Sequence, residues 1–153
     1  MYKKIMVALD GSAVSMRAFE QALGLAKDER AALQAVYIVE YPNIYIADVG
    51  YDPVAVMEPL VQEGQRILDK AEALMKARGL AASSRLIDNG PAFGPIAEQL
   101  QAAADECQAD LVVLGAHGRS GFKRLLLGSV AEAFVRLSRR PTLLVPGKSG
   151  NAS

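Results

Sequence analysis

The stretch Leu111-Val-Val-Leu-Gly-Ala-His-Gly-Arg-Ser-Gly-Phe-Lys-Arg-Leu-Leu-Leu-Gly-Ser-Val130 places an apolar run directly before a glycine-rich loop and a helical pattern. The run Leu111–Leu114 is typical of a strand buried inside a sheet. Glycines between a strand and a helix let the backbone approach a ligand and direct several N–H groups at it. The loop also carries Arg119, Lys123 and Arg124. This combination predicts a phosphate-binding loop at the carboxyl end of a strand.

Outward from this stretch, strand-like and helix-like segments alternate along the chain. Short, mainly apolar runs predict strands at Ile5–Leu9, Leu33–Val39, Leu111–Leu114 and Thr142–Val145, and a weaker pattern predicts one at Ser84–Ile87. Apolar residues recur at helical spacing over Phe19–Ala26, Leu60–Met75, Ile96–Cys107 and Val130–Leu137. Gly79 is placed to end the second helix as a left-handed cap, and Pro95 suits the first turn of the third. The alternation predicts a five-stranded parallel α/β sheet with helices on both faces, in a flavodoxin-like order.

Length and composition limit the number of domains and the class of protein that the chain can form. The chain has 153 residues, which predicts one domain at 1–146 and a polar tail at 147–153. It shows no signal-peptide pattern and no apolar run near the ~18 residues of a membrane helix. Its one cysteine, Cys107, fits a reducing compartment and is expected on an apolar helix face.

Charge is balanced over the whole chain but unevenly distributed. Residues 110–153 hold seven Lys/Arg and two Asp/Glu, whereas residues 1–109 hold ten and fifteen. A formal net charge of +0 does not favour nucleic acid as a partner. The basic segment carrying the glycine loop suits a small anion instead.

Three features follow the predicted strands at their carboxyl ends, where ligands bind in such sheets: Asp10, Asp88 and the loop after Leu114. That loop runs from Gly115 to Gly128. A second long connection, Tyr41–Pro53, holds three of the five tyrosines, Tyr41, Tyr45 and Tyr51. Connections of this length are usually functional. The tyrosines could form a flap over a ligand or an oligomer contact.

Two residues have both a structural and a ligand-binding interpretation. Ser129, with Glu132 three residues on, forms a capping-box pattern at the start of the last helix, and the same helix end could hold phosphate. Asp10 could cap the first helix, form a turn with Gly11 and Ser12, or accept ribose hydroxyls. The chain lacks both the Gly-x-Gly-x-x-Gly and the Gly-x-x-x-x-Gly-Lys-Ser/Thr patterns, which excludes the ordinary dinucleotide and P-loop motifs.

The pattern Gly115-x2-Gly118-x9-Gly128-Ser129 resembles the nucleotide motif of the universal stress protein family, and the opening Lys4–Ser12 resembles that family's first strand with its terminal aspartate. The likeness extends from Tyr2 to Pro146. It implies a five-stranded α/β fold of adenine-nucleotide alpha-hydrolase-like order 3-2-1-4-5, a cytoplasmic location, homodimers and bound ATP.

The resemblance also implies which residues contact ATP. Ala8, Leu9 and Asp10 would border the ribose and adenine, and the backbone of Ile38 would meet the adenine edge. The ribose and phosphates would be wrapped by Gly115, His117, Gly118, Arg119, Ser120 and Gly121. The terminal phosphates would be held by Gly128, Ser129 and Val130.

The expected function is that of an ATP-binding regulator or sensor in the stress response, with little or no hydrolysis. His117 is the only histidine and has no evident partner as a general base, so the sequence offers no clear group to activate water. Mg²⁺ would arrive with the phosphates. The expected assembly is a homodimer through the last strand, with a higher oligomer as the alternative, and neither nucleic-acid binding nor membrane insertion is expected.

Two other functions stay open. One is a slow ATP-hydrolysing enzyme of the same fold, for which Asp10 and His117 would matter. The other is a phosphoryl-accepting, receiver-like signalling domain built on Asp10, Asp88 and Lys148.

Overall fold

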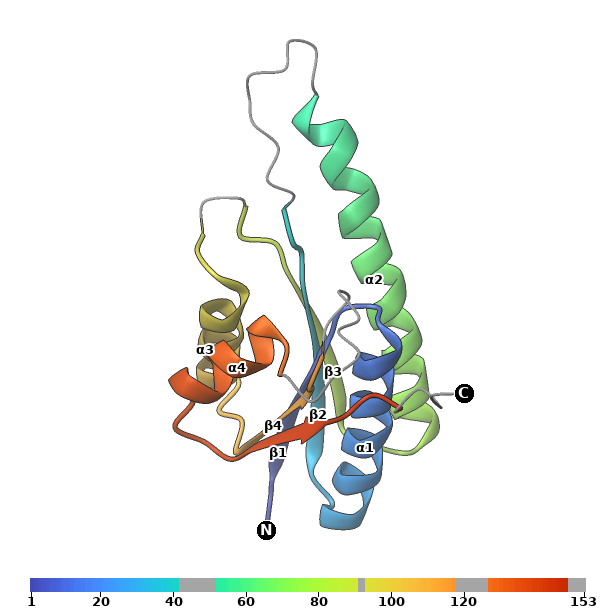
Figure 1. Ribbon diagram of the computed structural model, residues 1–153. Coiled ribbons are helices and arrows are strands. Elements are labelled where there is room, and N and C mark those ends of the chain that lie inside the picture. The colour runs from blue at the N-terminus through green and yellow to red at the C-terminus, as the bar shows by residue number, and fades with distance from the viewer. Residues whose placement is uncertain (42–51, 91–92, 118–126, 149–153) are drawn as a thin grey trace, which may run out of the picture.

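The computed structural model describes residues 1–41, 52–90, 93–117 and 127–148 (Figure 1). Its strands form one parallel five-stranded sheet in the order β3-β2-β1-β4-β5, which confirms the predicted fold class. The strands are β1 (Lys4–Leu9), β2 (Ala32–Ile38), β3 (Ala82–Ile87), β4 (Leu111–Gly115) and β5 (Thr142–Val145). Each lies within two residues of its predicted bounds.

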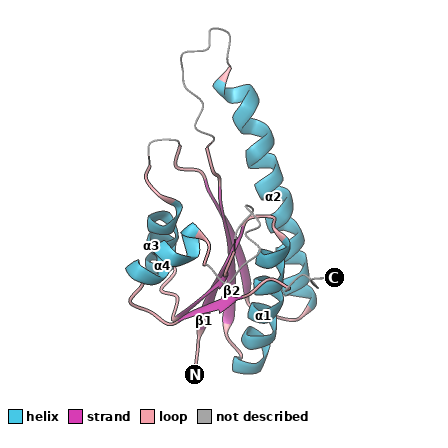
Figure 2. Ribbon diagram, viewed as in Figure 1, coloured by secondary structure: helices cyan, strands magenta, loops and turns pink. Residues whose placement is uncertain are grey.

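Helices cover both faces of the sheet (Figure 2). The helices α1 (Ala13–Glu29) and α2 (Pro53–Ala77) lie on one face, and α3 (Ile96–Glu106) and α4 (Ser129–Leu137) lie on the other. Side chains alternate between the faces along each strand. In β1, Ile5 and Val7 pack with α1 and α2, whereas Met6 packs with α3 and α4. Both faces are therefore apolar, which explains why the central strands β1 and β4 appear in the sequence as nearly continuous apolar runs.

The helix α2 ends as the sequence predicts. Gly79 has a left-handed φ of +71°, its N–H donates to the Lys76 carbonyl at 2.9 Å, and the Leu80 N–H donates to the Met75 carbonyl at 3.1 Å. These two hydrogen bonds form a Schellman motif, in which glycine avoids the steric cost of positive φ. The amino-terminal turns of α2 extend beyond the carboxyl edge of the sheet (Figure 1).

Two predicted helix starts are wrong by one residue. Pro95 is the N-cap of α3 rather than part of its first turn, with an extended backbone of φ −62° and ψ 150°. Gly128, not Ser129, is the N-cap of α4, and as a glycine it has no side chain with which to cap the helix. The expected capping box is therefore absent, and Glu132 pairs with Arg136 at 2.8 Å instead.

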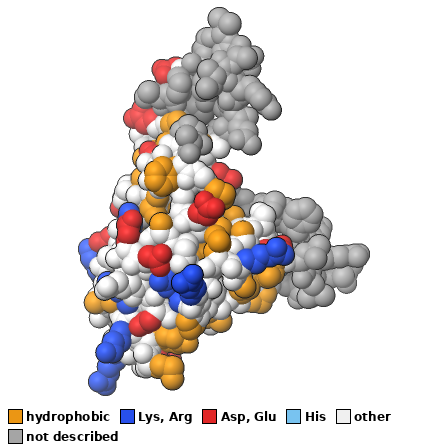
Figure 3. Space-filling view, turned by 90° about the vertical axis from the view of Figure 1, so that its left-hand side faces the viewer, with side chains coloured by type: hydrophobic (Ala, Val, Ile, Leu, Met, Phe, Trp, Pro, Cys, Tyr) orange, Lys and Arg blue, Asp and Glu red, His pale blue; other side chains and the backbone are white. Residues whose placement is uncertain are grey.

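The surface over α3 and α4 carries acidic and basic side chains interspersed with apolar ones (Figure 3). Ion pairs link neighbouring elements here: Arg140 contacts Asp105 at 2.6 Å, and Arg85 of β3 contacts Glu106 of α3. Cys107, expected on the apolar face of α3, is the C-cap of that helix. It is half-buried against the apolar core between the sheet and the helices α3 and α4. In the described parts of the chain, no helix is long and apolar enough to cross a membrane.

Candidate functional site

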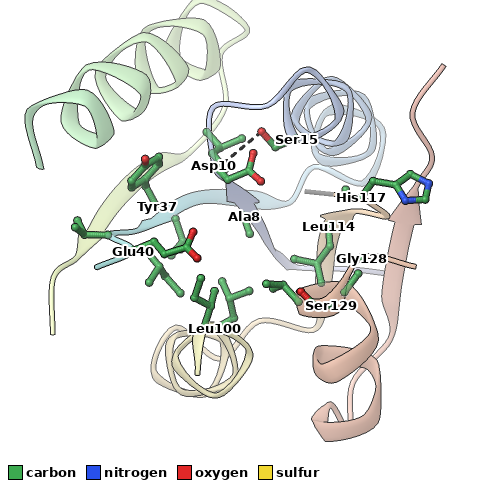
Figure 4. A pocket seen from close by; sticks show the side chains of 18 of the residues that line it. Ala8, Asp10, Ser15, Tyr37, Glu40, Leu100, Leu114, His117, Gly128 and Ser129 are labelled. Carbon is green, nitrogen blue, oxygen red and sulfur yellow. Dashed lines mark hydrogen bonds between the residues drawn. The ribbon is translucent and has the colours of Figure 1, made fainter. Parts of the chain in front are cut away.

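A cavity of about 380 Å³ opens at the carboxyl edge of the sheet, bordered by β1, β2, β4, α3 and the start of α4 (Figure 4). From β1 the chain winds outward to β2 and β3, whereas β4 and β5 lie on the other side of β1. The boundary between β1 and β4 is therefore the point where the strand order reverses. Open α/β sheets bind ligands at this point. The volume is that of a small-molecule site.

The floor of the cavity is apolar. Ala8 of β1, Val36 and Ile38 of β2 and Leu114 of β4 belong to the core on the α3–α4 face of the sheet. From above this face, α3 contributes Ile96 and Leu100. Such a surface suits a flat apolar group, because contact removes both surfaces from water.

A hydrogen-bonded turn forms the wall at the end of β1. The Asp10 carboxylate accepts a hydrogen bond from the Ser12 N–H at 2.8 Å. The Ser12 hydroxyl accepts from the Ser15 N–H at 3.1 Å and so caps α1. The Ser15 hydroxyl accepts from the Asp10 N–H at 3.3 Å and donates to the Ser12 carbonyl at 2.9 Å. Asp10 therefore makes the predicted turn, Ser12 caps the helix, and the carboxylate is held at the cavity (Figure 4).

The opposite wall is the start of α4. The Gly128 N–H donates to the Ala116 carbonyl at 2.7 Å, and the Ala116 N–H donates to the Val145 carbonyl of β5 at 2.8 Å. These bonds tie both ends of the glycine loop to the sheet. Gly128 has φ −60° and ψ 155°, a conformation that any residue adopts, so the backbone itself does not require glycine there. The first N–H groups of α4 have no intrahelical acceptor, and the helix dipole makes this end positive.

Every predicted site residue in the described part of the chain lines this one cavity: Ala8, Leu9, Asp10, Ile38, Gly115, His117, Gly128, Ser129 and Val130. The remaining predicted residues, Gly118, Arg119, Ser120 and Gly121, lie outside the described residues, as do Lys123 and Arg124. The structure thus brings together segments that are far apart in the sequence. That these residues bind a nucleotide stays a prediction.

Comparison with known proteins establishes the family. Residues 1–146 match the profile of the universal stress protein family. The chain belongs to this family. It is 32% identical over 145 residues to Universal stress protein MJ0531 of Methanocaldococcus jannaschii, covering 95% of this chain and 82% of that protein.

Solved structures of the universal stress protein family agree with the fold. A family member from Burkholderia pseudomallei has a TM-score of 0.79 and 38% identity, with 95% of this chain and 97% of that chain covered. A universal stress protein in complex with cAMP has a TM-score of 0.66 and 26% identity, with 94% and 97% covered.

His117 lies at the margin of the cavity in this universal stress protein. Figure 4 shows its ring beside β5 rather than over the apolar floor. Its Nδ1 is buried and has no hydrogen-bond partner among the described residues. In that same part of the chain, no group of three or more His, Cys, Asp or Glu side chains could hold a metal ion.

The groups of the receiver-like alternative are not brought together. Asp10, Asp88 and Lys148 follow β1, β3 and β5, and in the sheet another strand separates each of these from the next. Neighbouring strands are about 4.8 Å apart, so these positions lie roughly 10 Å or more from one another.

Asp88 instead accepts a hydrogen bond from the Tyr41 hydroxyl. This hydrogen bond, more than desolvation or charge repulsion from the carboxylate, raises the pKa of Tyr41. Tyr45 and Tyr51 lie outside the described residues.

The sequence reasoning missed part of the cavity wall: Ser15, Val36, Tyr37, Val39, Glu40, Leu60, Ile96, Leu100, Leu114 and Ala131. Some of these could have been found. Val36 is two residues before Ile38 and shares its face, and Leu100 follows Ile96 by one helical turn. Glu40 and Ser15 carry no comparable signal, because their positions depend on how the chain turns after each strand.

Proposed function

We propose that this universal stress protein binds ATP together with Mg²⁺ in the cavity at the carboxyl edge of its sheet. It would act in the cytoplasm as a nucleotide-dependent regulator or sensor of the stress response, with little or no hydrolysis. The observation that carries this proposal is the convergence of an apolar floor, a carboxylate and an uncapped helix start on one cavity. A relative of 26% identity that was solved with cAMP supports an adenine nucleotide as the ligand class.

The two ends of the cavity suit the two ends of a nucleotide. The apolar side chains Ala8, Val36, Ile38 and Leu100 offer a surface for the base. The start of α4 offers free N–H groups and a positive dipole end to phosphate oxygens. Asp10, at the end of β1, lies where a carboxylate can accept ribose hydroxyls.

In this proposal Mg²⁺ enters the site bound to the nucleotide phosphates. It keeps several waters and usually takes one or two carboxylates besides the substrate phosphates. Among the described residues on the cavity wall, Asp10 carries the carboxylate that could take this role. The bound ion would neutralise part of the triphosphate charge, and the chain's own residues would position the nucleotide.

Binding without efficient hydrolysis follows from what surrounds the phosphate end. A general base must reach the attacking water. Asp10 is engaged by the Ser12 N–H, and His117 lies at the margin of the cavity. A ligand that orders the glycine loop would shift the protein between conformations, which is what a sensor requires. The slow ATP-hydrolysing enzyme is the second candidate, since both Asp10 and His117 line the cavity.

Calorimetry with ATP·Mg²⁺ on nucleotide-free protein tests the proposal, together with a Gly128→Ser variant. Serine is at least as good an N-cap as glycine, so this variant should keep its thermal stability or gain a few tenths of a kcal/mol. Its side chain would occupy the phosphate approach, and losing one hydrogen bond to a charged group weakens binding roughly tenfold or more. The dissociation constant for ATP should therefore rise while the fold is retained.

The matched control is Gly24→Ser on α1, where an added Cβ meets nothing within 4 Å. This control should bind ATP like the unaltered protein. Absence of binding heat and of nucleotide in mass spectra of freshly purified protein would contradict the proposal. Phosphate release well above background in the same samples, lost in Asp10→Ala or His117→Ala, would favour the slow enzyme.

A further inference from the structure

Glu40 places a carboxylate on the wall of the cavity. It follows Val39 just beyond the end of β2, and its side chain is exposed. It makes no hydrogen bond or ion pair within the described residues. It lines both the main cavity and an adjoining one that is bordered by Tyr41 and Gln99. Figure 4 shows its carboxylate turned toward the cavity on the β2 side, away from Gly128 and His117 on the β4 side.

With Glu40 in this position, the two ends of the cavity differ in charge. A free carboxylate on the β2 side repels phosphate, whereas the start of α4 on the β4 side attracts it. A nucleotide in this cavity is therefore oriented with its base toward Glu40 and its phosphates toward Ser129. The apolar side chains Ile38 and Leu100 lie on the base side of this arrangement.

The chemistry of the carboxylate then discriminates between bases. An ionised carboxylate only accepts hydrogen bonds. At position 6, adenine carries an amino group, which donates, whereas guanine and hypoxanthine carry an oxo group, which accepts. Because 6-oxopurines also carry a donor at N1, the discrimination requires that the carboxylate face position 6 rather than N1. Two acceptors facing each other cannot form a hydrogen bond, and a base that leaves the carboxylate facing an acceptor loses affinity.

We infer that Glu40 accepts a hydrogen bond from the 6-amino group of the bound nucleotide and selects adenine over 6-oxopurines. This inference rests on the proposed function, because it assigns a role to one side chain of the same nucleotide cavity. Glu40 is then a specificity-determining residue that acts beside the backbone of Ile38. Glutamine at this position could turn its amide to donate to a 6-oxo group or to accept from a 6-amino group, and would therefore discriminate poorly.

Calorimetry with ATP, ITP and GTP, each with Mg²⁺, on the unaltered protein and on Glu40→Gln tests this inference. The unaltered protein should bind ATP roughly tenfold more tightly than ITP, the ratio that one charge-assisted hydrogen bond provides. In Glu40→Gln the ratio should fall to within about threefold, mainly because ITP binds better. The control Glu20→Gln removes the same charge from an exposed position on α1 that lines neither cavity, and should keep the original ratio.

The outcomes separate the two claims. An unchanged ATP-to-ITP ratio in Glu40→Gln, with ATP still bound, overturns the role of Glu40 and leaves the nucleotide site standing. Binding of ITP or GTP by the unaltered protein as tightly as ATP also overturns it. Failure of all three nucleotides to bind overturns the proposed function itself. Urea unfolding of Glu40→Gln checks that its fold is intact.

Discussion

Replacing Gly115 by alanine should destabilise the protein, because a β-carbon at this position has no room beside α1. The added Cβ would lie 2.8 Å from Val14 Cγ1 and 3.3 Å from both the Val14 carbonyl carbon and the His117 carbonyl oxygen. Val14 cannot simply rotate away, since valine in a helix has one strongly preferred rotamer. Its other methyl group faces Gly147, where an added Cβ would come within 3.2 Å of Cγ2. The side chain is therefore enclosed by glycines at the ends of β4 and β5.

The size of the effect follows from two opposed contributions. Overpacking of this kind costs about 1–3 kcal/mol. Gly115 does not have positive φ, so alanine adds no backbone strain and recovers about 0.5–1 kcal/mol of unfolded-state entropy. The central values leave a net loss of about 1 kcal/mol, which for a chain of this length lowers Tm by about 2–4 °C.

A double-mutant cycle with Val14→Ala identifies the cause. Val14 is half-buried, so its truncation loses part of a methyl-group burial and gains helix propensity, leaving stability within about 1 kcal/mol of the original. In the double variant the Cγ1 clash is gone, and the loss should be smaller than the sum of the single losses by about 0.5 kcal/mol or more. Urea unfolding followed by far-ultraviolet circular dichroism measures all four proteins.

The same substitution elsewhere provides the control. Gly24 lies inside α1, and its added Cβ meets nothing within 4 Å. Gly24→Ala should therefore stabilise the protein by up to about 1 kcal/mol through helix propensity. An unchanged stability of Gly115→Ala, or additivity in the cycle with Val14→Ala, would refute the reasoning from close packing.

Two further outcomes are expected. The hydrogen bond to Asp88 raises the pKa of Tyr41, so the stability from this pair is complete below about pH 10 and is lost as pH rises through the higher folded-state pKa. Asp88→Asn should lower that pKa in an NMR titration of the tyrosine ring, and an unmoved titration would exclude the hydrogen bond as its cause. In sedimentation velocity the chain should behave as a dimer. In β5, residues 141, 143 and 145 make the hydrogen bonds to β4, so the Leu144 N–H points outward at the edge of the sheet. If β5 pairs with β5 of a second copy, Leu144→Pro removes this N–H from the contact and should give monomers. A dimer that persists in a folded Leu144→Pro variant would place the interface elsewhere.

The sheet could be predicted from the sequence because its central strands β1 and β4 are buried on both faces. Runs such as Ile5–Leu9 and Leu111–Leu114 are apolar at every position, and a parallel α/β sheet is the arrangement that buries them. Gly79 could likewise be placed at the end of α2 because its left-handed conformation is a local requirement. These features depend on the local sequence, so they can be predicted without knowledge of the tertiary structure.

The start of α4 could not be predicted in the same way, because a long-range contact decides it. The pattern Ser129-x-x-Glu132 satisfies the local capping rule. The Gly128 N–H, however, is held by the Ala116 carbonyl, which fixes Gly128 as the last extended residue before the helix. Ser129 then becomes the first helical residue, and Glu132 turns to Arg136 one turn further along. Glu40 was missed for a related reason, since only the folded chain shows toward which side it points.

This error in the sequence prediction strengthens the argument for a phosphate at the same place. A serine or aspartate as N-cap would satisfy one of the free N–H groups of α4, whereas glycine leaves them open. The backbone of Gly128 gives no reason for glycine, since its φ is −60°. What a glycine at the N-cap does provide is access, because Gly128 itself places no side chain between the first turn of α4 and the cavity. A helix start without a ligand would be slightly more stable with a side-chain cap, so the glycine agrees with the proposed phosphate site. Substituting Gly128 with serine therefore separates stability from binding, because the two are expected to change in opposite directions.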